Sequence, residues 1–501
     1  MDVAMESSEF FQCFSKYIDN INNIVWGIPL ITVVLLTGIL LTILLRGLQI
    51  FHLPLALGYM VRNEKGATGE VSSLGAFCTA LSATVGTGNI VGVATAITAG
   101  GPGALFWMWV AALFGMATKY AEGLLAVKYR IVRPDGTFLG GPFHYIERGL
   151  GPKWKFLAVL FAFFGAVCAV SGTGTLTQVQ SITSSVQNVF DPGGIHVLKY
   201  GFLSSTWANA IAGLVVGVAA ALVILGGLKR IAVVSEFVVP VMIAIYFLMS
   251  FGVLVCNYSE IPHAFYEIFY GAFHPSAVTG GMVGSVFIVL QKGVSRGIFS
   301  NEAGLGTAPI VAAAAQTQYP ARQGMVCMTG AFVSTFVVCT MTGLTIVCMS
   351  TWNLGEGIAV TSKAFELALP FLGRGVVSFL LMLCLVFFAF TTCLGWSYYG
   401  ERCLDYLTGG RKTWTMGYRW FYILVVFIAP YMDLKLVWSI ADIFNGLMAF
   451  PNLIALVALS FAVVSETNSY FALLKKGKLD DSAPKQGDSD ALTSKLERRS
   501  E

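Results

Sequence analysis

Residues 79–101 read TALSATVGTGNIVGVATAITAGG. It is apolar enough to cross a membrane, yet its centre, Val85-Gly86-Thr87-Gly88-Asn89, disfavours a helix. Glycine raises the backbone cost of a helix, while Thr and Asn side chains offer competing local hydrogen bonds. A backbone that leaves the helix inside hydrocarbon must find other hydrogen-bond partners. The stretch therefore predicts a transmembrane segment that is broken near its middle.

The composition is that of a membrane protein. Of the 501 residues, 56% are hydrophobic and only 12% are charged, whereas a soluble chain carries about 25% charged residues. The ten cysteines form no C-x-x-C pair and the five histidines no H-E-x-x-H motif, a pattern that fits neither a disulfide framework nor a zinc site. The net charge of +4 is small, and we expect no nucleic-acid partner.

The two ends of the chain differ from its middle. The first 20 residues contain Glu6, Glu9 and Asp19 in place of a basic region and an apolar stretch, so we expect no signal peptide. Residues 1–25 are expected to form an amphipathic segment at the membrane interface. Residues 26–464 form the transmembrane domain, and residues 465–501 a polar tail.

Apolar stretches long enough to cross a bilayer indicate the transmembrane helices. A bilayer core of about 30 Å needs roughly 20 apolar residues per helix. Two of the apolar regions, 156–188 and 277–315, are too long for one straight helix and must tilt, extend or break. The sequence predicts eleven spans, at about 26–45, 74–99, 104–127, 156–188, 206–227, 232–255, 277–315, 323–350, 375–403, 414–431 and 436–464.

The loops between these spans orient the chain. Segments that follow the odd-numbered spans hold 23 basic residues, and the opposite set holds five. Because basic residues are retained on the cytoplasmic side, we expect the N-terminus outside and the C-terminus in the cytoplasm of a cell-membrane protein.

The predicted span 277–315 is interrupted like the span 74–99. Residues 277–315 carry glycines together with Lys292, Arg296, Asn301 and Glu302. If the first span is set aside, the other ten divide into five and five, about 74–255 and 277–464, and each half begins with an interrupted span. Five is odd, so the second half enters the membrane from the opposite side. This is the inverted repeat of the LeuT-type all-α fold, and paired interrupted helices indicate a transporter site.

The residues also carry a family resemblance. The chain resembles the alanine or glycine:cation symporter family, the sodium:alanine symporters, along most of its length up to about residue 464. The matching motifs are SATVGTGNIVGVATAI (82–97), GGPGALFWMW (100–109), KYAEGLLAVKYR (119–130), GGPFHYIERGLG (140–151), SRGIFSNEAGLGTAPI (295–310), LGWSYYGERCLDYL (394–407) and IADIFNGLMAFPNLIAL (440–456).

The resemblance implies sodium-driven uptake of alanine or glycine, without an organic cofactor or catalysis, by a protein we expect to be a monomer. Broken helices expose backbone N–H groups for a carboxylate and carbonyls for a cation. We therefore expect Thr87, Gly88 and Asn89 to hold the substrate carboxylate. Gln178 is the polar side chain that we expect to face the substrate, and a hydrogen bond between helices is the alternative.

Family resemblance places further residues in the pocket. It implies that Thr392, Trp396 and Ile440 line it and that Trp396 limits substrate size; an interfacial position is the alternative for Trp396. Alignment with the LeuT-type pattern implies a sodium site of the following groups: the carbonyls of Ser82 and Val85 and the hydroxyls of Thr391 and Thr392. A threonine can instead bond to its own helix.

The intramembrane charges are read as structural or gating groups. Lys292, Arg296 and Glu302 could neutralise one another, and Asp442 could act as a gate partner. Proton coupling and a non-transporting amino-acid sensor of the same fold stay open. An ion channel fits the interrupted spans poorly, and an enzyme would need a reactive cluster that the sequence does not contain.

Overall fold

The computed structural model describes residues 17–477 apart from 19, 23, 63, 65, 173, 194–196, 201–202, 275–285, 356 and 433. The side chains of residues 197–200, 203–204 and 434–440 are also not described. Most of the expected interfacial segment 1–25, the start of the 277–315 region and the end of the tail therefore lie outside the described residues.

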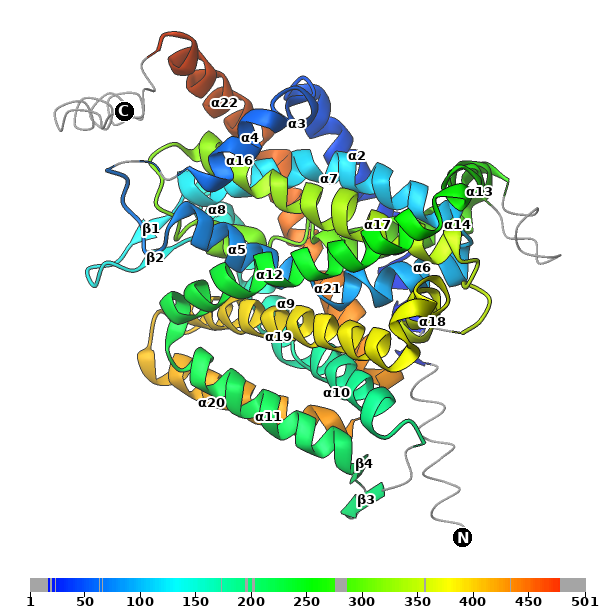
Figure 1. Cartoon of the computed structure of the whole chain (residues 1–501). Helices are drawn as coiled ribbons and strands as arrows, with labels where there is room; N and C mark the ends of the chain where they lie inside the picture. Colours follow the sequence, from blue (N-terminus) through cyan, green and yellow to red (C-terminus); the bar gives the residue numbers. More distant parts are fainter. Residues whose placement is uncertain are drawn as a thin grey trace, which may run out of the picture.

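The described chain is built almost wholly of helices (Figure 1). Two short antiparallel hairpins pair β1 (Ile131–Val132) with β2 (Phe138–Leu139) and β3 (Val197–Tyr200) with β4 (Leu203–Thr206). The α-helices are α2 (Ile28–Leu44), α3 (Leu48–Phe51), α4 (Leu53–Val61), α5 (Ser73–Thr84), α6 (Val91–Gly100), α7 (Gly103–Lys128), α8 (Pro142–Tyr145), α9 (Lys155–Ser171), α10 (Leu176–Phe190), α11 (Trp207–Ile224), α12 (Gly227–Cys256), α13 (Ile261–Phe273), α14 (Val286–Asn301), α15 (Ala308–Ala312), α16 (Pro320–Ala331), α17 (Thr340–Cys348), α18 (Ile358–Ala368), α19 (Arg374–Leu407), α20 (Lys412–Ile428), α21 (Leu434–Ala458) and α22 (Ser460–Lys475).

Several of these helices are suited to a membrane. Among the described residues, seven helices are long and apolar enough to cross one, and eight if α5 and α6 count as one bent span. The predicted spans 26–45, 277–315 and 414–431 coincide with the shorter helices α2, α14 with α15, and α20. The protein is thus a multi-pass membrane protein, while the count of eleven stays a prediction.

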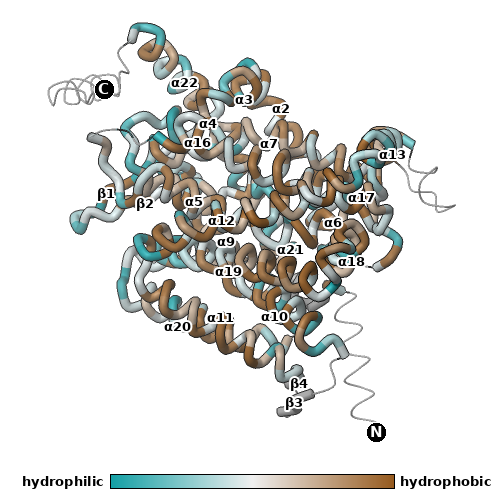
Figure 2. Tube along the Cα trace, viewed as in Figure 1, coloured by the Kyte–Doolittle hydropathy of each residue, from teal (hydrophilic) through white to brown (hydrophobic). Residues whose placement is uncertain are grey.

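Burial separates central helices from peripheral ones. In the apolar 18-residue stretch of α7, 83% is buried inside the protein, whereas the corresponding share is 39% in α11 and in α12. The outer helices expose large apolar side chains such as Leu222, Phe237 and Trp420, and hydrophobic residues run along α11 and α20 in Figure 2. Soluble proteins rarely expose such continuous apolar surface, so these faces are suited to lipid.

The interior is built around two packed groups of helices. α7 packs against α2, α14 and α16, while α9 packs against α19 and α21. The β1–β2 hairpin and α22 lie at one end of the bundle, and α13 and α18 at the other (Figure 1). The breaks in α5–α6 and α14–α15 face each other between these groups, because the turn joining α5 to α6 contacts both α14 and α19.

The long regions are interrupted, as their length predicts. Region 156–188 divides into α9 and α10 around Gly172, and region 277–315 divides after Asn301. The first part of the expected polar tail 465–501 is helical, because α22 continues to Lys475. Thr467 and Tyr470 are buried in this helix, and Lys128 of α7 lies 2.5 Å from Glu466. Packing against α7 thus extends the helix past the apolar stretch.

Candidate functional site

The first break lies where the glycines predict it. α5 ends at Thr84, a short 3-10 turn η1 (Thr87–Asn89) follows, and α6 leaves at 62° to α5. The Asn89 side chain holds the turn closed, because its Oδ1 accepts the Gly86 N–H at 3.1 Å. Its amide nitrogen donates to Ser334 Oγ at 2.7 Å. Asn89 is therefore used to shape the break and to fasten it to the π-helical turn η6 (Phe332–Cys339).

Thr87 carries two polar groups, its hydroxyl and its N–H, that are poorly hydrogen-bonded in the break. Its hydroxyl oxygen is buried and has no hydrogen-bond partner in the described part of the chain. Its N–H lies 3.5 Å from Gln178 Oε1, at the limit of a hydrogen bond. Buried polar groups are almost always paired. The Thr87 hydroxyl and N–H, with the Gln178 side chain opposite, thus form a polar site with capacity to bind a ligand.

Both glycines of the break are in close contact with neighbouring helices, and the contact at Gly86 leaves no room for a Cβ. A Cβ on Gly86 would lie 2.4 Å from Thr392 Oγ1, and one on Gly88 would lie 3.0 Å from the Phe299 ring. Real Cβ atoms essentially never come within 3.0 Å of another group. The break is therefore enclosed by α19 on one side and by the end of α14 on the other.

The two threonines of α19 behave differently. Thr392 Oγ1 lies 2.9 Å from the Ser82 carbonyl oxygen of α5 and 2.9 Å from that of Phe388. Thr391 Oγ1 lies 2.9 Å from the carbonyl oxygen of Phe387, in its own helix. The structure thus brings Thr392 to the predicted Ser82 carbonyl, with Val85 at the end of the same turn, and gives Thr391 a local bond. Oxygen groups of this kind suit a hard cation.

Trp396 is a core residue and not an interfacial one. It follows Thr392 by one turn of α19, is 1% exposed, and donates its indole N–H to Glu302 Oε1 at 3.0 Å. A Cβ on Gly174, at the α9–α10 break, would lie 2.4 Å from Trp396 Cβ. The indole is thus fixed between two interrupted helices. The side chain of Ile440 lies outside the described residues.

The second break is centred on Glu302. Its φ of +54° is unusual for a residue with a side chain, and Gly304 and Gly306 also have positive φ. Glu302 Oε2 accepts hydrogen bonds from Thr307 at 2.7 Å and from Thr84 at 3.3 Å. Since Glu302 also holds Trp396, one carboxylate connects both broken helices with α19.

The predicted mutual neutralisation of Lys292, Arg296 and Glu302 is wrong within the described part of the chain. Arg296 forms its ion pair with Asp442, at 3.4 Å, and Lys292 interacts electrostatically with both members of that pair. The Trp26 indole N–H donates to the Asp442 backbone oxygen at 2.7 Å. Glu302 points away from this group because the break turns its backbone toward Thr84 and Trp396.

Sequence reasoning missed several neighbours of the site. Phe299 packs on Gly88, Ser334 binds Asn89, and Ser235 Oγ of α12 lies 3.4 Å from Ser82 Oγ. The motif SRGIFSNEAGLG contains Phe299, so its position beside the break was available from the sequence. Ser334 belongs to a π-helical turn, for which the sequence gives no comparable signal.

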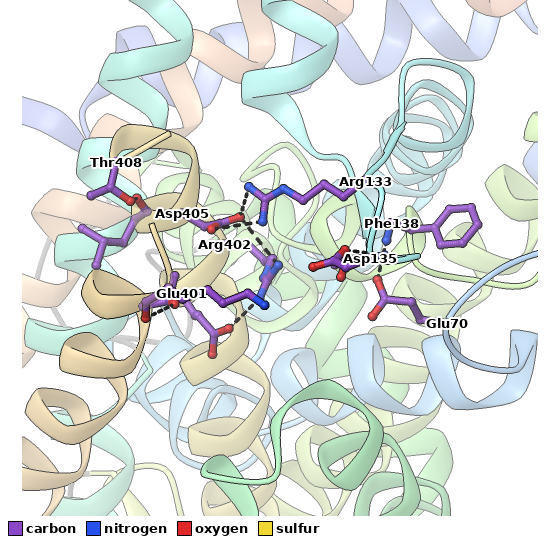
Figure 3. A network of polar contacts seen from close by, with 12 residues as sticks. Glu70, Arg133, Asp135, Phe138, Glu401, Arg402, Asp405 and Thr408 are labelled. Carbon is purple, nitrogen blue, oxygen red and sulfur yellow. Dashed lines mark hydrogen bonds and ion pairs between the residues drawn. The ribbon is translucent and has the colours of Figure 1, made fainter. Parts of the chain in front are cut away.

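A charged network closes the bundle at the end that carries the β1–β2 hairpin (Figure 3). Arg133 pairs with Asp405 at 2.8 Å, and Glu401 pairs with Arg402 at 2.5 Å and with Arg419 at 2.7 Å. Asp405 lies roughly 20 Å along α19 from Thr392, at 1.5 Å per residue. The network is therefore separate from the broken helices.

The loop side of this network is partly buried. Glu70 accepts the Phe138 N–H at 2.6 Å, and burial raises the pKa of this carboxyl. Burial also lowers the pKa of His144 to about 4. His144, Arg133 and Arg402 line a cavity of about 250 Å³.

Known proteins resemble this chain along most of its length. Residues 11–484 match the model of the sodium:alanine symporter family. The chain belongs to that family. It is 44% identical over 471 residues to the sodium/alanine symporter AgcS of Methanococcus maripaludis, covering 92% of this chain and 98% of the relative. It is 36% identical over 480 residues to a putative sodium/proton-dependent alanine carrier protein of Bacillus subtilis, over 92% of this chain and 94% of that one.

A solved structure supports the fold. The crystal structure of MhsT in complex with L-phenylalanine, a LeuT-type protein, aligns with a TM-score of 0.57 at 12% identity, over 80% of this chain and 93% of that chain. At this identity the likeness concerns the fold alone. The symporter family membership makes the protein an amino-acid transporter and not an enzyme.

Proposed function

We propose that this symporter couples the inward movement of sodium to the uptake of alanine, and of glycine, by alternating access. The observation that carries the proposal is the broken α5–α6 segment, in which the Thr87 hydroxyl is buried without a partner beside Gln178. Such a site accepts a small zwitterion with few rearrangements. The printed names of AgcS and of the Bacillus relative, both concerned with alanine, support the substrate class.

The substrate carboxylate binds to the backbone N–H groups around Thr87, Gly88 and Asn89 and to the Thr87 hydroxyl. The α6 helix begins just after this turn, so its positive dipole end is directed toward the carboxylate. Trp396 forms the wall that limits the substrate side chain, and Ile440 is expected on the same wall. Phe299, pressed against Gly88, further restricts the space. Alanine and glycine are the amino acids that such a pocket favours.

Sodium binds between α5 and α19. The proposed ligands are the carbonyls of Ser82 and Val85 with the hydroxyls of Thr391 and Thr392. The 2.9 Å contact between Thr392 and the Ser82 carbonyl supports this pairing of helices. Thr391 would have to exchange its bond to Phe387 for the ion. A Thr392 hydroxyl beside Gly86 places the ion next to the substrate turn, which provides a route for coupling.

The remaining expectations concern the architecture. We propose eleven spans with an inverted repeat over about 74–255 and 277–464, the N-terminus outside and the C-terminus in the cytoplasm. The end that carries the Arg133–Asp405 network is then cytoplasmic, in agreement with its basic loops. The transmembrane domain is expected to work as a monomer.

Counterflow in proteoliposomes tests the function. Purified protein is reconstituted with unlabelled alanine inside, and entry of labelled alanine is followed with and without external sodium. We expect entry of labelled alanine to depend on sodium and to be inhibited by competing glycine. Entry that needs a proton gradient but no sodium would favour a proton-coupled carrier, and binding of alanine without any entry would favour a sensor.

A further inference from the structure

Three buried ionisable groups lie together beside the second break. Lys119 and Glu122 belong to α7, and Glu302 opens the break between α14 and α15. Their exposed fractions are 2%, 0% and 1%. Lys119 interacts electrostatically with both carboxylates. Ionisable groups inside a membrane protein are costly, and such a cluster calls for a function.

The two carboxylate oxygens of Glu122 differ in their hydrogen bonding. Glu122 Oε1 accepts the Gly306 N–H at 3.0 Å and the Asn452 side-chain N–H at 2.7 Å. Glu122 Oε2 is buried and has no hydrogen-bond partner among the residues that the structure describes. A buried carboxylate oxygen that accepts no hydrogen bond carries a large desolvation cost. A proton on Oε2 removes that cost.

The amide of Asn452 cannot turn to fill the gap. Its nitrogen also donates to the Gly304 carbonyl at 2.9 Å, and its oxygen accepts the Tyr145 hydroxyl. Both ends of the amide are thus occupied. The geometry that leaves Oε2 without a donor is held by three elements: α8, α21 and the second break.

The net charge of the three groups also favours a proton on Glu122. With all three groups ionised, one positive and two negative charges leave one negative charge uncompensated. Glu302 receives hydrogen bonds on both oxygens, from Thr84, Thr307 and Trp396, so it is the better placed carboxylate to stay ionised. Among the described residues, the other ionisable groups that act on Glu122 are Tyr145 of α8, Cys327 of α16 and Tyr399 of α19, and none of these is cationic.

We propose that Glu122 binds one exchangeable proton at Oε2, and that this proton stabilises the second break in the form seen here. The inference rests on the proposed transport function for its physiological meaning. The ligand is a proton, delivered from water and returned to it. A cavity of about 10 Å³ lined by Lys119, Thr84 and Gln323 adjoins the cluster, which is room for about one water molecule that could relay it.

The site is connected to the substrate region through the backbone. Glu122 holds Gly306, and the same break carries Glu302, whose carboxylate touches Thr84 of α5 and the Trp396 indole. Loss of the proton leaves a buried negative charge beside Gly306 and destabilises this arrangement. Transport should therefore slow as the pH rises through the titration of Glu122.

The test compares Glu122→Gln with wild type and with Glu302→Gln. Sodium-driven alanine uptake is measured in proteoliposomes from about pH 5.5 to 9, with sodium gradient and membrane potential held constant. Wild type should lose about tenfold in rate per pH unit above the titration point, as for a single proton. Glu122→Gln mimics the protonated form, so its uptake rate should no longer fall at alkaline pH. Glu302→Gln should take up alanine more slowly at every pH and should still show the alkaline fall. A flat wild-type profile, or parallel profiles in wild type and Glu122→Gln, overturns the proposal.

Infrared difference spectra of purified wild type give a second readout that does not depend on transport. A carboxylic-acid carbonyl band that disappears at alkaline pH, and that is absent from Glu122→Gln, is expected. Absence of such a band in wild type overturns the proton site even if Glu122→Gln fails to fold. If sodium and alanine fail to drive any uptake at any pH while the band titrates, the transport function fails and the proton site stands.

Discussion

Gly86→Ala tests whether the first break is the binding site. Gly86 has φ −135° and ψ −150°, an extended conformation that alanine can adopt. Its effect must therefore come from the new Cβ, 2.4 Å from Thr392 Oγ1 and 3.3 Å from Thr392 Cβ. To restore ordinary contact the hydroxyl must move by about 1 Å, which breaks its 2.9 Å contact with the Ser82 carbonyl.

The cost follows from two terms. Loss of the hydrogen bond removes about 1 kcal/mol, and forcing a methyl group into a packed site costs about 1–3 kcal/mol. The bound form needs Thr392 in place and carries this cost of about 2–4 kcal/mol, whereas the free form relieves it by moving the hydroxyl. We therefore expect binding to weaken by up to roughly 30-fold to 700-fold at about 1.4 kcal/mol per tenfold. Because Thr392 serves both proposed sites, alanine and sodium affinity should fall together.

Gly92→Ala is the matched control. Gly92 lies in α6, close to Gly86 in sequence, and a Cβ there meets nothing within 4 Å. The assay is equilibrium binding of labelled alanine to purified protein over a range of sodium concentrations, with thermal unfolding of each variant as a check on folding. Gly92→Ala should bind like wild type. A folded Gly86→Ala that binds alanine within threefold of wild type would refute the reasoning.

The other predictions concern the pocket wall, the ion ligands and acid stability. Trp396→Ala should admit valine and leucine and weaken alanine, as judged by competition against labelled alanine; an unchanged competition profile would place the indole outside the pocket. Thr392→Val should reduce the sodium dependence of alanine binding more than Thr391→Val, because only Thr392 reaches the Ser82 carbonyl, and equal effects would contradict this. The pKa of His144, lowered to about 4 by burial, lies below its unfolded value of about 6.5, so its contribution to stability is complete above about pH 6.5 and is lost as the pH falls toward 4. His144→Gln should reduce the fall in Tm on acidification, and an identical pH dependence in both proteins would count against it.

The parts of the site that could be predicted from sequence are local. The break at Gly86–Asn89 follows from residues that disfavour a helix inside an apolar span, and it lies where the pattern places it. Thr391 and Thr392 are predicted as a pair of ion ligands, although adjacent side chains on a helix point about 100° apart. Helix geometry alone therefore indicates that the two hydroxyls cannot lie equally close to α5.

The parts that could not be predicted depend on distant pairing. Arg296 finds Asp442 on α21, and Glu302 finds Trp396 on α19, because the positive φ of Glu302 turns its side chain away from α14. Spacing along the chain cannot specify such partners. The helix beyond residue 464 is another case, since it is held by the burial of Tyr470 and Thr467 and not by an apolar pattern of its own.

The most direct test of the central claim measures whether sodium and alanine bind as linked ligands. Alanine isotherms are recorded at several sodium concentrations, and sodium isotherms at several alanine concentrations, on the same preparation of wild-type protein. A shared site around Thr392 predicts that each ligand raises the affinity of the other by the same factor, since coupling free energy is reciprocal. Alanine binding that is indifferent to sodium across that range would contradict the account.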